Sequence, residues 1–418
     1  MTQEEFKNRE LSLDVIIPQY KETDDIIRPL LDSIEMQASI SFKNIRTIIV
    51  NDHSDVKLSK EFLDHYKKIN ISYIETPENK GPGQARQYGI DNSEADYIMF
   101  ADADDRLFSC NLFKEIYTTL RNNQDKKIDL IYTKWVEELV TADDILHVPH
   151  NTPDMTWLHG KIFRRQFLLD KNLRFNDRIK VHEDSYFNTI TQMNVGTTAS
   201  LDMYSYFWVY NTDSLTRNKS YKYNYLVETA DDLVTSIGDT MEALTQRKTP
   251  KREEYFVKGI LFMYFLLQAP YWNDTLATDQ ELQLRRRRYE YGILKLLTKY
   301  ADIINNLDRK VFLKAYNDER AQCLVNTGFE TEQETWNQFL ARIQKAYPSY
   351  VHNCYDCKHG VFDAGGKLTC PFSVGNQCTM SLDQVYGIYS TPTKWEEKVE
   401  TSDTSDKPTK KKTTKKKE

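Results

Sequence analysis

The stretch YIMFADADDRLF, residues 97–108, decides how the chain is best interpreted. Its first half is apolar, as in a buried strand, and three carboxylates, Asp102, Asp104 and Asp105, follow directly. Clustered acids repel one another and are costly beside a hydrophobic core. Divalent cations such as Mg²⁺ or Mn²⁺ bind carboxylate oxygens and leave positions open for substrate phosphates. The stretch indicates either a cation site or a polar turn whose aspartates cap the next helix.

The chain before this stretch alternates between strand and helix patterns. The apolar runs that we expect to be strands are Leu13–Ile17, Arg46–Val50, Ile71–Glu75 and Tyr97–Ala101. Between them, Asp25–Met36 and Ser59–Ile69 place apolar residues on one helical face. This alternation is typical of βαβ units on a mostly parallel sheet. In such α/β sheets, ligands bind beyond the carboxyl ends of the strands, where the acidic stretch lies.

Two other expected strands also end in polar residues. Pro18–Glu22, with the sequence PQYKE, follows the first, and Asn51–Ser54, with the sequence NDHS, follows the second. A carboxylate such as Asp52 can accept a hydrogen bond from a uracil ring or a ribose hydroxyl. An isolated tetrapeptide of this kind is more often a turn, so its value lies in sharing a sheet edge with the acidic stretch.

A glycine-rich segment, Asn79–Gly89, opens a further helix with the sequence NKGPGQARQYG. The free amides and the positive dipole at such a helix start suit a diphosphate. Arg86 could bind a phosphate there or pair with Asp102. A glycine-rich helix start alone is weak support for a ligand site.

The order of these motifs, PQYKE, VNDHS, NKGPGQARQYG and YIMFADADD, resembles glycosyltransferase family 2, whose members are inverting enzymes of the GT-A fold. The resemblance covers residues 12–105 and extends more weakly to about residue 220, through WLHGKIFRRQFL, LRFNDRIKVHEDSYF and NTDSLTR. Two residues depart from the family pattern, His53 where glycine is more common and Gln87 where asparagine is usual.

The resemblance implies roles for the residues at the strand ends. Asp52 would contact the nucleobase, Asp102 the ribose or the donor sugar, and Asp104 would bind Mn²⁺ or Mg²⁺ against the donor diphosphate. The residues expected to bind the nucleotide-sugar are Pro18, Tyr20, Glu22, Asp52, Arg86, Asp102 and Ala103.

The resemblance also implies a catalytic base. Asp184 matches the family's base, and Glu183 is the second candidate. The alternative for both acids is a helix N-terminus, whose dipole favours negative charge. Trp157, His159 and Lys161 would border the donor sugar or its phosphates, although core packing explains Trp157 equally well.

Four cysteines near the C-terminus have a spacing typical of a structural Zn²⁺ site. They are Cys354, Cys357, Cys370 and Cys378. A glycine-rich hairpin around Asp363–Gly366 is expected between the second and the third. The alternatives are ligation by His352 or His359, or thiols without metal.

The chain is expected to form more than one domain, because 418 residues are more than a single hydrophobic core usually supports. Helical apolar spacing predominates after about residue 221, and the last segment is rich in lysine. The expected domains are a GT-A domain at 1–220, with a nucleotide-binding half at 12–105 and an acceptor half at 106–220, a helical domain at 221–348, a zinc module at 349–392 and a disordered Lys-rich tail at 393–418.

Hydropathy and the first residues predict a cytoplasmic protein. No apolar segment approaches the roughly 20 residues of a membrane helix, the longest being Gly259–Leu267. The start, MTQEEFKNRE, is acidic and polar, unlike a signal peptide. The net charge of −6 argues against a chain that is basic throughout.

The sequence thus predicts a metal-dependent inverting transferase that moves a sugar from a nucleoside-diphosphate sugar, UDP-linked, to an acceptor hydroxyl. The acceptor is left open among a glycan, a cell-wall polymer, a protein and a hydroxylated base in DNA. The alternative is a nucleic-acid-associated binding protein with a vestigial transferase fold. Arg285–Arg288 are expected to be a solvated surface or a contact for a polyanion, and the helical region to cover the acceptor side or to join subunits.

Overall fold

The computed structural model describes residues 11–123, 125–141, 143–212, 224–268, 272, 280–327, 337–341, 361–362 and 368–369. The chain divides into two compact units, residues 1–274 with 295–333 and residues 275–294 with 334–418. The α/β elements and most of the described helices belong to the first unit.

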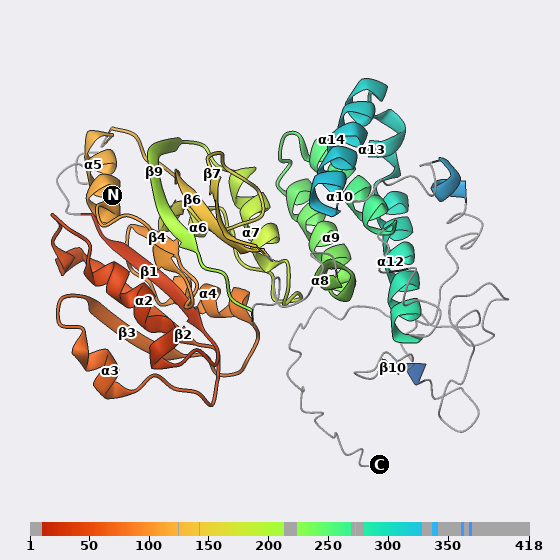
Figure 1. Ribbon diagram of the computed structural model, residues 1–418. Coiled ribbons are helices and arrows are strands. Elements are labelled where there is room, and N and C mark those ends of the chain that lie inside the picture. The colour runs from red at the N-terminus through yellow and green to blue at the C-terminus, as the bar shows by residue number, and fades with distance from the viewer. Residues whose placement is uncertain are drawn as a thin grey trace, which may run out of the picture. The chain divides into compact units, whose positions relative to one another are not determined.

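Four parallel strands form the first half of the main sheet (Figure 1). β1 (Leu13–Gln19) pairs with β2 (Ile45–Asn51) on one side and with β4 (Tyr97–Phe100) on the other, and β3 (Asn70–Glu75) pairs with β2. The connecting helices are α2 (Asp24–Glu35), α3 (Lys60–His65) and α4 (Pro82–Asp91), with the 3-10 turn η1 (Phe42–Asn44) before β2. The βαβ units expected from the sequence are confirmed.

Beyond β4 the sheet is mixed. β8 (Lys161–Arg164) runs antiparallel to both β4 and β6 (Leu130–Val140), whereas β9 (Thr198–Trp208) runs parallel to β6. β5 (Arg106–Leu107) pairs with β9, and β7 (Ile145–His150) forms a hairpin with β6. The helices of this half are α5 (Leu112–Asn122), α6 (Arg165–Asp170) and α7 (Glu183–Gln192).

Alternate residues of β1 enter two hydrophobic clusters, one on each face of the sheet. Val15 and Ile17 join the cluster that includes α2 and α5, whereas Ile16 joins the cluster that includes α4, α6 and α7. Burial on both faces accounts for the continuous apolar run of this strand. On the second face, a Cβ added to Gly89 of α4 would lie 2.4 Å from Ile16 Cγ2, so this helix packs very closely on the strand.

Helices follow the α/β elements, as the sequence indicates. They are α8 (Asn224–Glu228), α9 (Ala230–Gln246), α10 (Arg252–Leu266), α12 (Gln280–Lys299), α13 (Ala301–Asn306) and α14 (Arg309–Thr327). In the first unit, Ala243 and Leu244 of α9 join the cluster on the α4 and α7 face of the sheet. Arg285–Arg288 of α12 are half-buried rather than fully solvated, and Arg286 Nε donates to Glu290 Oε1 at 3.4 Å.

Near the C-terminus, β10 (Val361–Phe362) and β11 (Leu368–Thr369) form an antiparallel pair around the expected hairpin. The four candidate zinc ligands, Cys354, Cys357, Cys370 and Cys378, lie outside the described residues. Within the described part of the chain, every helix is too short or too polar to cross a membrane.

Candidate active site

The carboxyl ends of the central strands lie side by side. Asp52 N–H extends the pairing of β1 with β2 by donating to Gln19 O at 2.9 Å. On the other side of β1, Ala101 N–H donates to Ile16 O at 3.1 Å. The segments that start at Asp52 and Asp102 therefore leave the same edge of the sheet, which is where ligands bind in open α/β sheets.

Asp52 is buried and holds the glycine-rich turn that starts α4. Its Oδ2 accepts from Gly81 N–H at 2.7 Å, and its Oδ1 accepts from Lys80 N–H and from Thr76 Oγ1, both at 3.2 Å. Gly81 has φ +88°, a backbone conformation that residues other than glycine rarely adopt. The structure thus gives Asp52 a part in shaping the amide-rich helix start, and its contact with a nucleobase stays a prediction.

The PQYKE segment lies within electrostatic reach of the acidic stretch. Pro18 is half-buried at the end of β1, and Tyr20 is exposed. Tyr20 N–H donates to Glu22 Oε2 at 2.5 Å. Burial raises the pKa of Glu22 to about 7, and the charges of Asp104 and Asp102 add to the rise. The segment therefore shares one electrostatic environment with the strand end of β4.

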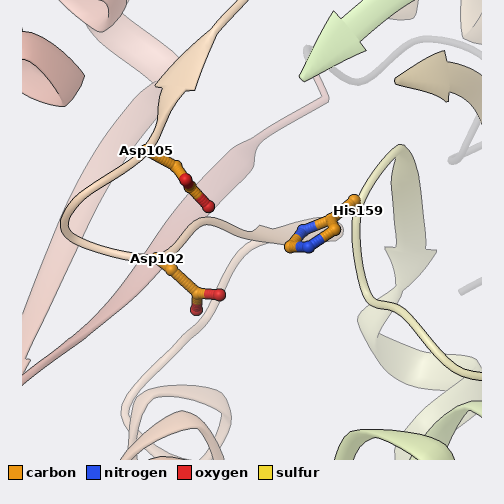
Figure 2. A group of neighbouring side chains, drawn as sticks. All are labelled: Asp102, Asp105 and His159. Atoms are coloured by element: carbon orange, nitrogen blue, oxygen red, sulfur yellow. The ribbon is translucent and has the colours of Figure 1, made fainter. Parts of the chain in front are cut away.

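Asp102 and Asp105 follow β4, and their side chains point toward the ring of His159, which precedes β8 (Figure 2). The three residues offer ligand atoms that all lie within 4.8 Å of one another. Tyr206 of β9 holds the two acids in place, because its hydroxyl donates to Asp105 Oδ2 at 2.5 Å and accepts from Asp102 N–H at 2.9 Å. Val209 N–H donates to Asp105 Oδ1 at 2.8 Å.

The two acids of this group differ in their titration. Burial acts to raise the pKa of Asp102, but the charge and hydrogen bond of Arg86, together with the nearby ring of His159, outweigh it and hold the pKa below the usual value. For Asp105, burial raises the pKa well above the usual value, and the charges of Asp102 and Asp104 raise it further. A nearby cation would favour ionisation of both.

Asp104, the metal ligand implied by the sequence, lies outside this group of three. Its Oδ2 accepts from Asn211 Nδ2 at 2.7 Å. Ala103, between the two acids, is buried. Asp102 and Asp104 therefore have different partners, with Asp102 bonded to Arg86 and Asp104 bonded to Asn211.

His159 is neutral at ordinary pH. Its ring stacks on Tyr206, with centroids 4.4 Å apart, and burial lowers its pKa to about 4. A neutral imidazole can offer a nitrogen lone pair to a metal. Trp157 lies parallel to His159 with centroids 5.9 Å apart, and Lys161 Nζ donates to Trp157 O at 2.5 Å and to Asp154 Oδ2 at 3.3 Å. These contacts hold the loop of His159, and the donor contacts predicted for Trp157 and Lys161 stay predictions.

Arg86 joins the acidic stretch to the start of α7. Its Nη2 donates to Asp102 Oδ1 at 2.5 Å and its Nη1 donates to Glu183 Oε1 at 2.9 Å. The side chains of Arg86 and Glu183 are 7% and 9% exposed, so this pair is removed from water. Of the two possibilities that the sequence left for Arg86, pairing with Asp102 is the one that the structure shows.

Asp184 lies beside Glu183 in the first turn of α7. Burial raises the pKa of Asp184 to about 8, the charge of Glu183 raises it too, and Arg86 partly opposes the rise. Its Oδ1 accepts from Ser185 N–H at 2.7 Å. Glu183 already accepts from the guanidinium, so Asp184 is the better placed of the two to take up a proton.

These residues fit a divalent cation. Several acids at this edge lie close enough to raise one another's pKa. Neighbouring carboxylates, Asp104 among them, contribute to the raised pKa values of Glu22, Asp105, Glu183 and Asp184. Arg86 is paired with two of the carboxylates at this edge, so ionisation of the remaining acids would add negative charge that a bound cation could offset. Carboxylates are the ligands that suit Mn²⁺ or Mg²⁺, and a neutral imidazole can add a nitrogen ligand to a metal.

Three residues of the site were assigned no role from the sequence. Asp105 is part of the acidic stretch, so the available signal was three acids within four positions. Tyr206 lies within the stretch YSYFWV, residues 204–209, and Asn211 is the first residue of the motif NTDSLTR. Tyr206 lies 104 positions after Asp102, and Asn211 lies 107 positions after Asp104. No local sequence pattern links residues that are so far apart in the chain.

The comparison with protein families gives one match along the α/β part. The model of the family described as Glycosyl transferase family 2 matches residues 14–215. These residues include β2 to β9, all of β1 except its first residue, and the acidic edge described above.

Two curated relatives extend the likeness in different ways. The chain is 31% identical over 184 residues to the teichoic acid poly(glycerol phosphate) polymerase of Staphylococcus epidermidis, covering 41% of this chain and 25% of that protein. It is 27% identical over 380 residues to the glycosyltransferase GlyA of Streptococcus pneumoniae, covering 82% of this chain and 51% of that protein. The chain thus spans between a quarter and about half of the length of these relatives.

Among solved structures, residues 1–349 of S. aureus TarS have a TM-score of 0.55 at 16% identity, covering 88% of this chain and 98% of that one. The same TarS segment in complex with UDP-GlcNAc has a TM-score of 0.51. At this identity the likeness concerns the fold, and it includes helices after the α/β part.

Proposed function

We propose that residues 14–215, which the model of Glycosyl transferase family 2 matches, form a glycosyltransferase domain, and that the chain moves a sugar from a UDP-linked donor to a hydroxyl of a cell-wall polymer or glycan. The transfer inverts the anomeric centre and depends on Mn²⁺ or Mg²⁺. The complex of TarS with UDP-GlcNAc supports the choice of a UDP-linked donor. The name of the S. epidermidis relative supports an acceptor of the teichoic acid class.

One observation carries the proposal. Arg86 bonds to Asp102 at the end of β4 and to Glu183 at the start of α7. A donor bound at the strand edge would therefore lie close to Asp184, the next residue of that helix turn. Acids for the donor side and an acid for the acceptor side are parts of one site.

The donor side uses groups that the strand ends bring together. The amides at the start of α4, held by Asp52, would bind the diphosphate. Asp102, Asp105 and His159 would hold the cation, and the sequence adds Asp104 as a further candidate ligand. The cation, when bound, supplies positive charge against the leaving diphosphate as a Lewis acid.

The acceptor side uses Asp184 as the general base. A base must lie near the proton that it abstracts and have a pKa near the working pH. The pKa of about 8 meets the second condition, because such a carboxylate has a real affinity for the acceptor proton. Attack from the face opposite to the diphosphate gives inversion.

The cysteine segment completes the proposal as a structural part. We infer that Cys354, Cys357, Cys370 and Cys378 bind Zn²⁺ and stabilise a small module that has little core of its own. The β10–β11 pair is compatible with the hairpin expected inside it. We assign this zinc no part in sugar transfer.

Release of UDP from UDP-glucose and UDP-GlcNAc, with Mn²⁺ and purified teichoic acid as acceptor, tests the proposal. Asp184→Asn should lower the rate by about 10²–10⁴-fold, the usual contribution of a general base. Asp177→Asn, at an exposed position shortly before α7, is the matched control and should leave the rate unchanged. A wild-type protein that neither releases UDP nor gains thermal stability from UDP with Mn²⁺ would overturn the proposal.

A further inference from the structure

The loop that leads into α7 is hydrogen-bonded to one side of α9. Val181 N–H donates to Asp232 Oδ2 at 3.3 Å, and Ser236 Oγ donates to His182 O at 3.3 Å. His182 Nε2 lies 2.9 Å from Thr229 Oγ1, at the residue that precedes α9. Figure 1 shows α9 beside α7, and the two helices are in contact.

The residues of α9 that make these bonds form a helical stripe. Positions 229, 232, 236 and 239 are separated by three, four and three residues, which places them on one face of a helix. The fourth, Asp239, accepts from Asn176 Nδ2 at 2.8 Å and from Arg178 Nη1 at 3.1 Å. The stripe therefore follows the loop from residue 176 to the first residue before α7.

The loop is conformationally demanding at its last residue. His182 has φ 68°, in the left-handed region that is unfavourable for residues other than glycine. Its side chain is buried, and its carbonyl accepts from both Ser236 Oγ and Tyr186 N–H. Such a conformation persists where surrounding contacts fix it, and here the contacts come from α9 as well as from α7.

The next two residues after His182 are Glu183 and Asp184. The direction in which α7 starts is therefore set at His182, and the position of the Asp184 carboxylate depends on that direction. We propose that α9 places the catalytic base, with Thr229, Asp232 and Ser236 acting as positioning residues through the backbone of Val181 and His182. This inference rests on the proposed function, in which Asp184 is the base.

A purely architectural reading makes a different prediction. If the stripe only attaches α9 to the α/β domain, losing any of its bonds lowers the melting temperature without changing turnover by the folded enzyme. If the stripe positions Asp184, losing the bonds near α7 lowers turnover even where the protein is fully folded. A misplacement of about 1 Å can cost on the order of 10²-fold in rate.

The chain offers a matched pair of variants. Asp232→Ala removes the acceptor of Val181 N–H, next to α7, whereas Asp239→Ala removes the acceptor of Asn176 and Arg178, farther along the loop. Each variant loses one half-buried carboxylate of the same helix. Asp232→Asn keeps an oxygen that can accept from Val181 N–H and serves as the conservative variant. Ser236→Ala removes the donor to His182 O.

The experiment measures kcat, the KM for the UDP-sugar, the affinity for UDP with Mn²⁺, and the melting temperature, well below which the kinetics are run. Asp232→Ala and Ser236→Ala should lower kcat at least about tenfold and change the KM and the UDP affinity by no more than about twofold. Asp232→Asn should recover most of kcat. Asp239→Ala should change only the melting temperature. Equal kcat values for Asp232→Ala and Asp239→Ala would overturn the inference while leaving the proposed function intact. A wild-type protein that neither binds UDP nor turns over would overturn both.

Discussion

Arg86 and Glu183 are 97 positions apart in the chain, and Arg86 Nη1 donates to Glu183 Oε1 at 2.9 Å. The same guanidinium donates through Nη2 to Asp102 Oδ1. One side chain of α4 thus connects the strand edge that would bind the donor with the helix that carries the candidate base.

Replacing Arg86 should destabilise the fold as well as the site. Arg86→Gln leaves Glu183 buried without its cation, and breaking a buried ion pair from one side costs about 3–5 kcal/mol. Arg86→Lys should have an intermediate effect, because an ammonium lacks the planar fork that binds two carboxylates at once. Urea unfolding measures the free energy of unfolding of each variant.

The double variant Arg86→Gln with Glu183→Gln is the control for this pair. It removes the uncompensated charge, so its free energy of unfolding should recover part of the loss seen for Arg86→Gln. Independent, additive effects of the two substitutions would show that the pair is not coupled.

His182 should make the fold sensitive to mild acid. A histidine in an unfolded chain has a pKa of about 6.5, and burial lowers the pKa of His182 to about 4. Because the folded-state pKa is depressed, the unfolded state binds the proton first. Stability is therefore complete above about pH 6.5 and is lost as the pH falls toward 4, by about 2 kcal/mol at pH 5 for this residue.

Comparing the pH dependence of two variants isolates this effect from that of His159, whose pKa is lowered in the same direction. His182→Asn keeps a residue type that tolerates the left-handed conformation and removes the titrating group. It should lose about 2 kcal/mol less than the wild type between pH 7 and pH 5. His65→Asn, at an exposed position, should follow the wild type, and identical curves for all three proteins would contradict the prediction.

Binding of Mn²⁺ should depend on His159. Replacing a residue that only orients a metal ligand typically lowers metal affinity 10–100-fold. His159 is proposed as a ligand itself, so His159→Gln should weaken Mn²⁺ binding at least about tenfold. His147→Gln is the control, because His147 is exposed and pairs with Glu138. Isothermal titration calorimetry measures the affinities, and an unchanged value for His159→Gln would exclude this residue as a ligand.

The same titration separates the two acids after Asp102. If the ligand group is Asp102, Asp105 and His159, then Asp105→Asn should weaken Mn²⁺ binding more than Asp104→Asn. The opposite order would favour the ligand that the family resemblance implies. Both substitutions keep the side-chain shape, so the difference reports on charge and ligation.

Gly89 should be intolerant of a side chain. In Gly89→Ala, the new Cβ would meet Ile16 Cγ2 of β1 at 2.4 Å, and overpacking of this kind costs about 1–3 kcal/mol. Gly238→Ala is the matched helical control, because its Cβ would meet only the end of Leu296 at 3.2 Å. The control should be neutral or slightly stabilising, since alanine favours a helix over glycine by about 1 kcal/mol. Thermal unfolding that ranks the two variants in the reverse order would contradict this packing.

The order of the elements could be read from the sequence with fair accuracy, because it depends on local periodicity. The strand expected at Leu13–Ile17 is found at Leu13–Gln19, and the helix expected at Asp25–Met36 is found at Asp24–Glu35. The helix expected over Ser59–Ile69 ends earlier, at His65. Tyr66 leaves the helical conformation, and its hydroxyl donates to Asp32 Oδ1 at 2.8 Å, a tertiary contact that local pattern does not contain.

The sequence by itself determined that polar segments follow the central strands and that an acidic cluster stands at the end of the fourth, since parallel strands bring their carboxyl ends to one edge. Tertiary structure alone decided which side chains meet there. His159, Tyr206 and Glu183 reach the edge from elements more than fifty positions away, and their pairing depends on how β8, β9 and α7 pack against β4 and α4. Local sequence spacing cannot predict that packing, because the partner of a buried charge depends on contacts between elements that are far apart in the chain.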